Sequence, residues 1–63
     1  MNGKKLRELR LERKLTLQQL ATLSGYSKSG LSEIENGIKT SITTGTLKGI
    51  AKALHVDYKE LLD

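Results

Sequence analysis

The sequence predicts a compact all-α domain of five short helices, and three observations predict it. The chain has 63 residues, which corresponds to a single domain with a small core. It contains no cysteine and only one histidine, so disulfides and a zinc site are excluded as staples and an aliphatic core must hold the fold. Leucine and isoleucine recur at helical spacing between capping residues and glycines. We expect one domain over residues 1–63.

The first helix is expected over residues 4–14, KKLRELRLERK, which contain strong helix formers and no breaker. Leu6 and Leu9 are three residues apart and would face the core. A second helix is expected over Leu17–Ser24, because Thr16 and Gln19 before and within its first turn form a capping-box pattern. Gly25 is the residue expected to end it in left-handed conformation.

A third helix is expected from Lys28 to about Asn36. Ser27 is a good N-cap for it, and Leu31 and Ile34 would face inward. Gly37 is the stop signal. Gly30 has two interpretations: it lets this helix approach DNA or the second helix closely, or it is a tolerated exposed position, and the second is favoured.

A polar loop is expected over residues 38–45, followed by a fourth helix over Thr46–Leu54 with apolar residues at helical spacing. His55 follows this helix, and a structural role at the helix end is favoured over a metal or catalytic role. Asp57 and Glu60 form a second capping box, which would open a fifth helix carrying Tyr58, Leu61 and Leu62.

Charge and composition narrow the class of protein. The net charge is +4, and residues 1–14 hold six of the 11 basic and two of the seven acidic residues, so the remaining chain is neutral. The excess indicates either an anionic partner or a solvated helix face. No transmembrane helix or signal peptide is present. A chain this small, with no clustered carboxylates, is not expected to be an enzyme, to hold a metal or cofactor, or to bind a small molecule.

The most informative pattern is a spacing of four residues. Ala21, Gly25, Leu31 and Ile34 lie at relative positions 0, 4, 10 and 13. Two helices that cross through a tight turn need a small residue at the crossing, a glycine in the turn and a narrow apolar stripe on the second helix. The spacing therefore predicts a helix-turn-helix formed by the second and third helices.

The segments TLQQLATLSGYSKSGLSEIENG and LKGIAKALHVDYKELL resemble the Cro/repressor-type (XRE) family of helix-turn-helix proteins. This family includes lambdoid phage repressors, plasmid copy-control proteins and bacterial antitoxins, and the resemblance covers residues 5–62. It implies a five-helix, lambda-repressor-like domain that binds double-stranded DNA, usually as a homodimer on a two-fold operator. Such a protein would act in the cytoplasm, at the bacterial or phage nucleoid.

The resemblance implies that the third helix enters the major groove. Helical geometry turns four side chains outward, and these are the expected base-reading residues: Lys28, Ser29, Ser32 and Glu33. Lys28 would donate to guanine and Glu33 would accept from cytosine. Glu33 also has another interpretation, in which it points to solvent or pairs with a lysine, because a carboxylate is repelled by phosphates.

Phosphate contacts are expected from helix N-termini and from the loop after the third helix. The candidates are Thr16, Leu17, Gln18, Ser27, Asn36, Lys39, Thr40, Ser41, Thr43 and Thr44. Leu17 departs from the family, in which a glutamine is common at this position, and this puts one phosphate contact in doubt.

Arg10 and Glu35 are expected to form a partly buried bridge between the first and third helices, as in the family. The alternative is that Arg10 contacts phosphate. Three leucines fall where such domains usually expose polar residues: Leu11, Leu17 and Leu23. They are either ordinary surface leucines or a contact patch for another protein. Ile38, Tyr58 and Leu62 are further candidates for dimer contacts.

The sequence thus favours a sequence-specific DNA-binding regulator, expected to be a repressor. The rival interpretation is a protein-interaction module of the same fold, supported by the neutral chain after residue 14, by Glu33 and by the three leucines. The operator sequence and the oligomeric state are not readable from this pattern.

Overall fold

A computed structural model describes residues 1–62. Across this range the chain forms four α-helices and one 3-10 turn, without a β-strand. The elements are α1 (Gly3–Glu12), α2 (Leu17–Ser24), α3 (Lys28–Glu35), α4 (Thr44–Leu54) and η1 (Tyr58–Leu61). The all-α prediction is confirmed.

The prediction of a fifth α-helix is corrected, because its segment forms the four-residue 3-10 turn η1. Glu60 N and Leu62 N donate to the carbonyls of Asp57 and Lys59, three residues earlier, as in a 3-10 helix. Asp57 Oδ1 accepts from Lys59 N at 3.0 Å, one residue before the partner expected for a capping box.

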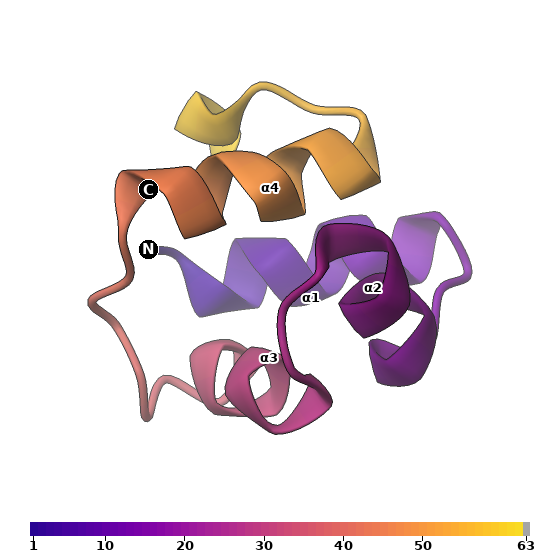
Figure 1. The fold of residues 1–63 in the computed structure, drawn as a ribbon, viewed down its shortest axis with the longest axis horizontal. Coiled ribbons are helices and arrows are strands. Elements are labelled where there is room, and N and C mark those ends of the chain that lie inside the picture. The colour runs from indigo at the N-terminus through magenta and orange to yellow at the C-terminus, as the bar shows by residue number, and fades with distance from the viewer. Residues whose placement is uncertain (63) are drawn as a thin grey trace.

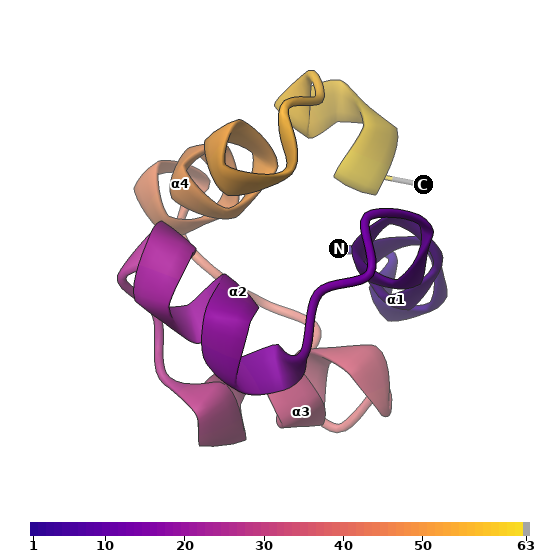
Figure 2. The same ribbon diagram turned by 90° about the vertical axis from the view of Figure 1, so that its right-hand side faces the viewer.

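The helices surround one core. In Figures 1 and 2, α3 lies at one end of the molecule, α4 and η1 lie at the other, and α1 and α2 connect them. Contacts join α2 to both α3 and α4, and join α1 to both α3 and η1. The fully buried large side chains come from every element: Leu6, Leu20, Leu31, Ile34, Ile50, Leu54 and Leu61.

The observed helix boundaries follow the capping residues. α1 begins before the predicted start because Asn2 Oδ1 accepts from Lys5 N at 3.0 Å. It ends before the predicted residue 14, where Lys14 takes the left-handed conformation with φ of 55°. α4 begins two residues before the predicted Thr46, because Thr43 Oγ1 accepts from Thr46 N at 3.2 Å and is the N-cap. His55 ends α4 with φ of 59°.

The α2–α3 unit has the predicted capping and turn residues. Thr16 Oγ1 accepts from Gln19 N at 3.0 Å and Gln19 Oε1 accepts from Thr16 N at 2.8 Å, so the capping box is formed. Gly25 ends α2 with φ of 75°, a left-handed conformation that favours glycine. Ser27 Oγ accepts from Gly30 N at 3.0 Å and starts α3.

Candidate nucleic-acid interface

The crossing of α2 and α3 exposes one face of α3. Ala21 is the small residue at the crossing, and Leu31 and Ile34 are buried beneath α3. Burial of these two side chains sets the rotation of the helix about its axis. The opposite face of α3 is therefore presented to solvent at the end of the molecule away from α4 (Figures 1 and 2).

The predicted base-reading residues lie on this outward face in different degrees. Lys28, Ser29 and Glu33 are exposed, while Ser32 is half-buried. The amide of Asn36 covers Ser32: its Nδ2 donates to the Ser32 carbonyl at 2.9 Å and to the Ser32 hydroxyl at 3.3 Å. Ser32 and Asn36 are thus joined to each other, and their polar groups are less free than those of Lys28 and Ser29.

The N-terminus of α2 carries two of the predicted phosphate contacts as backbone groups. The N–H groups of Leu17 and Gln18 lie in the first turn of α2, where an α-helix offers them no acceptor. Thr16 N already donates to Gln19, so Thr16 has only its hydroxyl proton to offer a ligand. A phosphate at this end would meet N–H donors and the positive end of the helix dipole.

The N-terminus of α3 has the same character. Ser27 is exposed and accepts from Gly30 N through its hydroxyl, while the N–H groups of Lys28 and Ser29 lie in the first turn. This end combines backbone donors with the Lys28 side chain on one exposed turn.

The loop from α3 to α4 begins against α3. Ile38 N and Lys39 N both donate to the Glu33 carbonyl, at 2.9 and 3.1 Å. Thr40 and Ser41 are exposed, and the Met1 amino group donates to the Thr40 carbonyl at 3.3 Å.

The last two predicted phosphate residues belong to the start of α4. The Thr43 hydroxyl caps this helix and also donates to Thr46 Oγ1 at 2.9 Å. Thr44 is exposed in the first turn of α4.

Arg10 and Glu35 lie together inside the molecule. Arg10 Nε and Nη2 donate to the two carboxylate oxygens of Glu35 at 2.7 and 3.0 Å, and Arg10 Nη1 donates to the Leu15 carbonyl at 2.7 Å. The side chains are only 10% and 5% exposed. The hydrogen bonds to Glu35 raise the pKa of Arg10, against the effect of its burial. This geometry leaves Arg10 turned inward, away from a phosphate.

Arg13 is a structural residue that sequence reasoning missed. Its Nε donates to the Leu54 carbonyl at 2.5 Å and its Nη1 to the Leu9 carbonyl at 3.2 Å. It thereby bonds an orphan carbonyl at the end of α4. Two of the basic residues in the segment 1–14, Arg10 and Arg13, thus bond groups of the protein itself. A count of basic residues does not distinguish such structural residues from residues that bind DNA.

Gly30 corrects the favoured sequence interpretation, because it is buried rather than exposed. A Cβ atom at this position would lie 2.5 Å from Cε2 of the Tyr26 ring and 2.8 Å from Ser27 Oγ. Glycine is needed here because the aromatic ring lies on the helix backbone. The paired spacing of Tyr26 and Gly30, four residues apart, is the signal in the sequence for this contact.

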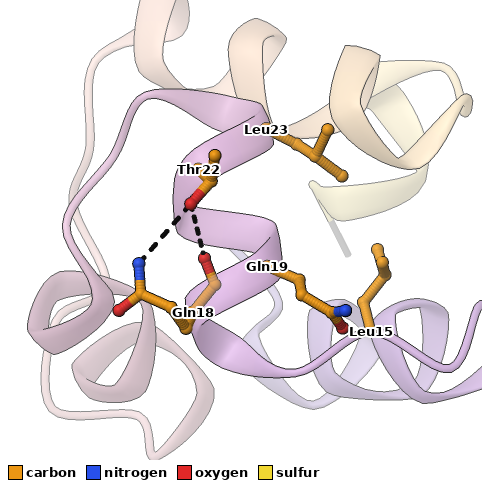
Figure 3. A pocket seen from close by; sticks show the side chains of 5 residues that line it. All are labelled: Leu15, Gln18, Gln19, Thr22 and Leu23. Atoms are coloured by element: carbon orange, nitrogen blue, oxygen red, sulfur yellow. Dashed lines mark hydrogen bonds between the residues drawn. The ribbon is translucent and has the colours of Figure 1, made fainter.

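A shallow apolar groove lies on another side of α2 (Figure 3). Leu15 and Leu23 line it with Gln18, Gln19 and Thr22. Leu11 and Leu23 are 54% and 60% exposed, as expected of surface leucines. Leu17 differs from them, because it is half-buried against the core.

The described part of the chain has neither a cluster of metal-binding side chains nor a membrane-spanning helix. Residues 1–62 contain no group of three or more histidine, cysteine, aspartate or glutamate side chains placed to hold a metal ion. Over the same residues, no helix has the length and apolar character needed to cross a membrane.

These features define a helix-turn-helix domain, and comparison with known proteins places it in a family. Residues 6–61 match the helix-turn-helix family of the XRE type. The chain therefore belongs to this family, which is one of transcriptional-regulator DNA-binding domains and not a class of enzymes.

Particular relatives are regulators of Bacillus subtilis. The chain is 50% identical over 60 residues to the HTH-type transcriptional repressor RghR of B. subtilis strain 168. This alignment covers 95% of this chain and 44% of RghR. The chain thus spans less than half the length of this relative.

Two solved structures of the B. subtilis regulator SinR have the same fold. The crystal structure of SinR, the master regulator for biofilm formation, in complex with DNA is 33% identical, with a TM-score of 0.94, and covers 100% of each chain. SinR in a complex with the protein SinI is also 33% identical, with a TM-score of 0.92, over 100% of this chain and 61% of that one.

Proposed function

We propose that residues 1–63 form the sequence-specific DNA-binding domain of a transcriptional regulator, which reads the major groove with α3. The observation that carries this proposal is the likeness to SinR solved with DNA, at a TM-score of 0.94 over the whole of both chains. The exposed outward face of α3, together with the N-termini of α2 and α3, is the feature of this chain that suits the function.

Lys28 and Ser29 are the leading base-reading residues of this proposal, because both are exposed in the first turn of α3. Lys28 donates to guanine O6 or N7, and Ser29 bonds several bases with little discrimination. Glu33 accepts from cytosine N4 at the far end of the same face. Ser32 contributes less, because it is half-buried beneath Asn36, whose amide donates to its hydroxyl oxygen.

Two helix N-termini and the loop after α3 bind phosphates in this proposal. The N–H groups at the start of α2, with the Thr16 hydroxyl, hold one phosphate, and the start of α3 at Ser27 holds another. The loop supplies Lys39, Thr40 and Ser41, and the exposed Thr44 adds a contact at the start of α4. Asn36 and Thr43 act by fixing the ends of α3 and α4 rather than by direct contact, because their side chains already bond protein groups.

The assembled regulator is a repressor that binds a two-fold operator as a pair of chains, in the cytoplasm where the DNA lies. RghR is named a transcriptional repressor, and this name supports repression rather than activation. Half-sites would lie about 34 Å apart, one turn of the duplex, so that two α3 helices enter successive major grooves on one side.

Lys28→Ala tests the reading face. Selection of bound sequences from random DNA first identifies a preferred duplex, and titration then compares it with a random duplex at two salt concentrations. We expect Lys28→Ala to lower the preference for the selected duplex by about 5- to 100-fold, because a good base contact is worth about 1–3 kcal/mol. Both affinities should fall as salt rises, because binding releases counterions.

Lys52→Ala is the matched control, because Lys52 is also an exposed lysine, lies on α4, and its substitution removes the same charge. It should leave the preference unchanged. Equal, weak affinity of the unaltered chain for selected and random duplexes would reject sequence-specific binding.

A second candidate function is protein binding, which the exposed Leu11 and Leu23 and the likeness to SinR in its complex with SinI favour. Chemical-shift mapping separates the two candidates. DNA should perturb residues 27–33 and 39–44 if the first is right. A protein-binding module would leave those residues unperturbed by DNA.

A further inference from the structure

Tyr26 lies beside α3 in a position that the proposed DNA contacts do not explain. It stands in the turn between α2 and α3 and is half-buried, with its ring edge on the backbone of Gly30. A Cβ atom added at Gly30 would lie 2.5 Å from Tyr26 Cε2 and 3.0 Å from Tyr26 Cζ, so the ring packs directly against the helix backbone.

Lys39, in the loop after α3, lies over this ring. Its Nζ lies 5.5 Å from the centroid of the Tyr26 ring, within the range of a cation–π contact. The backbone of Lys39 is also held, because Lys39 N and Ile38 N donate to the Glu33 carbonyl. The main chain of Lys39 is therefore bonded to α3 and its ammonium group contacts Tyr26, although the side chain is exposed.

The charges around Lys39 agree with this placement. A side-chain hydrogen bond to Tyr26, the charge interaction with the same side chain and, more weakly, the Glu33 carboxylate raise the pKa of Lys39. Its ammonium group also offsets the negative charge of Glu33, which would otherwise repel phosphates beside the outward face of α3.

We propose that Tyr26 is a positioning residue, which holds the Lys39 ammonium beside α3 as a preorganised phosphate contact, and that Gly30 provides the space for its ring. This inference rests on the proposed DNA-binding function and assigns a partner to one of its contacts. A free lysine loses side-chain freedom when it binds a phosphate, and the Tyr26 ring removes part of that freedom beforehand.

The test is a double-mutant cycle between Tyr26→Leu and Lys39→Met, with affinity for the selected duplex measured over a range of salt concentrations. Lys39→Met should reduce the slope of log K against log salt by about 0.9, the value for one phosphate. Tyr26→Leu should lower affinity about 2- to 5-fold in the unaltered chain, as expected for an exposed cation–π contact. Tyr26→Leu should have no further effect in the Lys39→Met background, because its partner is then absent.

Two controls separate positioning from a general loss of structure. Tyr26→Phe keeps the ring but removes the hydroxyl, whose hydrogen bond to Lys39 contributes to the raised pKa of that lysine. The affinity and the salt slope should stay if the ring holds the ammonium group, and a loss as large as that of Tyr26→Leu would overturn the cation–π contact in favour of the hydroxyl. In a Lys52→Met background, which removes a lysine from α4, Tyr26→Leu should retain its full effect.

A readout without DNA completes the test. In the unaltered free chain, the ε-methylene protons of Lys39 should be shifted upfield by the ring current of Tyr26. Gly30→Ala displaces the ring without altering Tyr26 or Lys39, so it should reduce this shift. Because the added Cβ atom would also lie 2.8 Å from Ser27 Oγ, its effect on affinity supports the positioning role only if Lys39→Met abolishes it. It serves in place of Tyr26→Leu if that variant does not fold.

The outcomes decide between the two levels of the proposal. An equal loss of affinity from Tyr26→Leu with and without Lys39, or the lack of an upfield shift in the unaltered chain, overturns the positioning role while DNA binding stands. Failure of the unaltered chain to bind any duplex overturns the proposed function and the role of Lys39 with it.

Discussion

Arg10 donates three hydrogen bonds inside the domain, two to Glu35 and one to the Leu15 carbonyl. The pair joins α1 to the last residue of α3 and is nearly closed to water. A buried pair of this kind does not by itself make a protein more stable than a well-packed apolar pair would. Loss of one partner is a different matter, because it leaves the other charge buried without a counterion.

Glu35→Ala should therefore lower the free energy of unfolding by roughly 3 kcal/mol, the lower end of the effect of breaking a buried pair. Urea denaturation followed by circular dichroism measures it. Glu12→Ala is the matched control, since Glu12 pairs with Arg13 at 3.5 Å while its own side chain is 67% exposed. The control should change stability by less than about 1 kcal/mol. Equal effects of the two substitutions would show that the buried bridge is not special.

At the scale of whole elements, two glycines lie in opposite surroundings: one at a contact between two helices and the other in open space. Gly3 begins α1 where it meets the end of α3: a Cβ atom there would collide with the Ile34 carbonyl oxygen and lie 2.9 Å from the carbonyl carbon. Gly45 lies in the first turn of α4, and a Cβ atom there would meet nothing within 4 Å.

Gly3→Ala and Gly45→Ala should consequently change stability in opposite directions. Gly3→Ala should destabilise by about 1–3 kcal/mol, because backbone atoms of Ile34 must move apart from α1. Gly45→Ala should stabilise by about 0.5–1 kcal/mol through the higher helix propensity of alanine. The midpoints of urea unfolding compare the two variants directly. A gain in stability for both would mean that the α1–α3 contact relaxes without difficulty.

Element boundaries show how far local patterns reach. α2 and its capping box have the predicted bounds, because Thr16, Gln19 and Gly25 bond within the segment itself. α4 begins earlier than the apolar spacing indicates, because the cap at Thr43 decides the start and the next core residue comes only at Leu47. The expected fifth helix is a 3-10 turn, since one buried leucine and i-to-i+3 bonds satisfy this short segment.

At the scale of the whole molecule, the last turn closes the core against the first helix. Asn2 N donates to the Leu61 carbonyl at 2.7 Å, and Leu61 is fully buried. α1 and η1 are thus in contact although they lie at opposite ends of the described sequence, as Figure 2 shows. The domain has few core residues, so each contributes a large share of a small total stability.

Leu61→Ala should lower the free energy of unfolding by about 2–5 kcal/mol, from lost burial and the cavity that remains. Its neighbour Leu62 is 46% exposed and provides the control. Leu62→Ala should change stability by no more than about 0.5 kcal/mol. Thermal unfolding is the suitable measurement, because 1 kcal/mol corresponds to roughly 4–8 °C in a domain of this size. Similar melting temperatures for the two variants would show that η1 does not close the core.

The candidate site was predictable where it follows helix geometry. Burial of Leu31 and Ile34 turns Lys28, Ser29 and Glu33 outward, as their spacing indicates. The site was not predictable where a side chain chooses among several polar partners. Asn36 bonds Ser32, Arg13 bonds the end of α4, and Tyr26 covers Gly30. No local pattern marks the Arg13 contact, because its partner Leu54 is distant in the sequence. The other two pairs are four residues apart, but that spacing alone does not say which partner a polar or aromatic side chain takes.

The sequence by itself determined the all-α class, the α2–turn–α3 unit and the membership of the core, because capping, left-handed glycines and apolar spacing act within a few residues. Only the tertiary structure decided which basic residues are free. Arg13 turns inward to the Leu54 carbonyl and Lys39 lies over Tyr26 beside α3, whereas the Arg10–Glu35 bridge is the one that the family resemblance implied. The physical reason is that a hydrogen bond or a cation–π contact depends on the distance between groups that the fold brings together from distant positions.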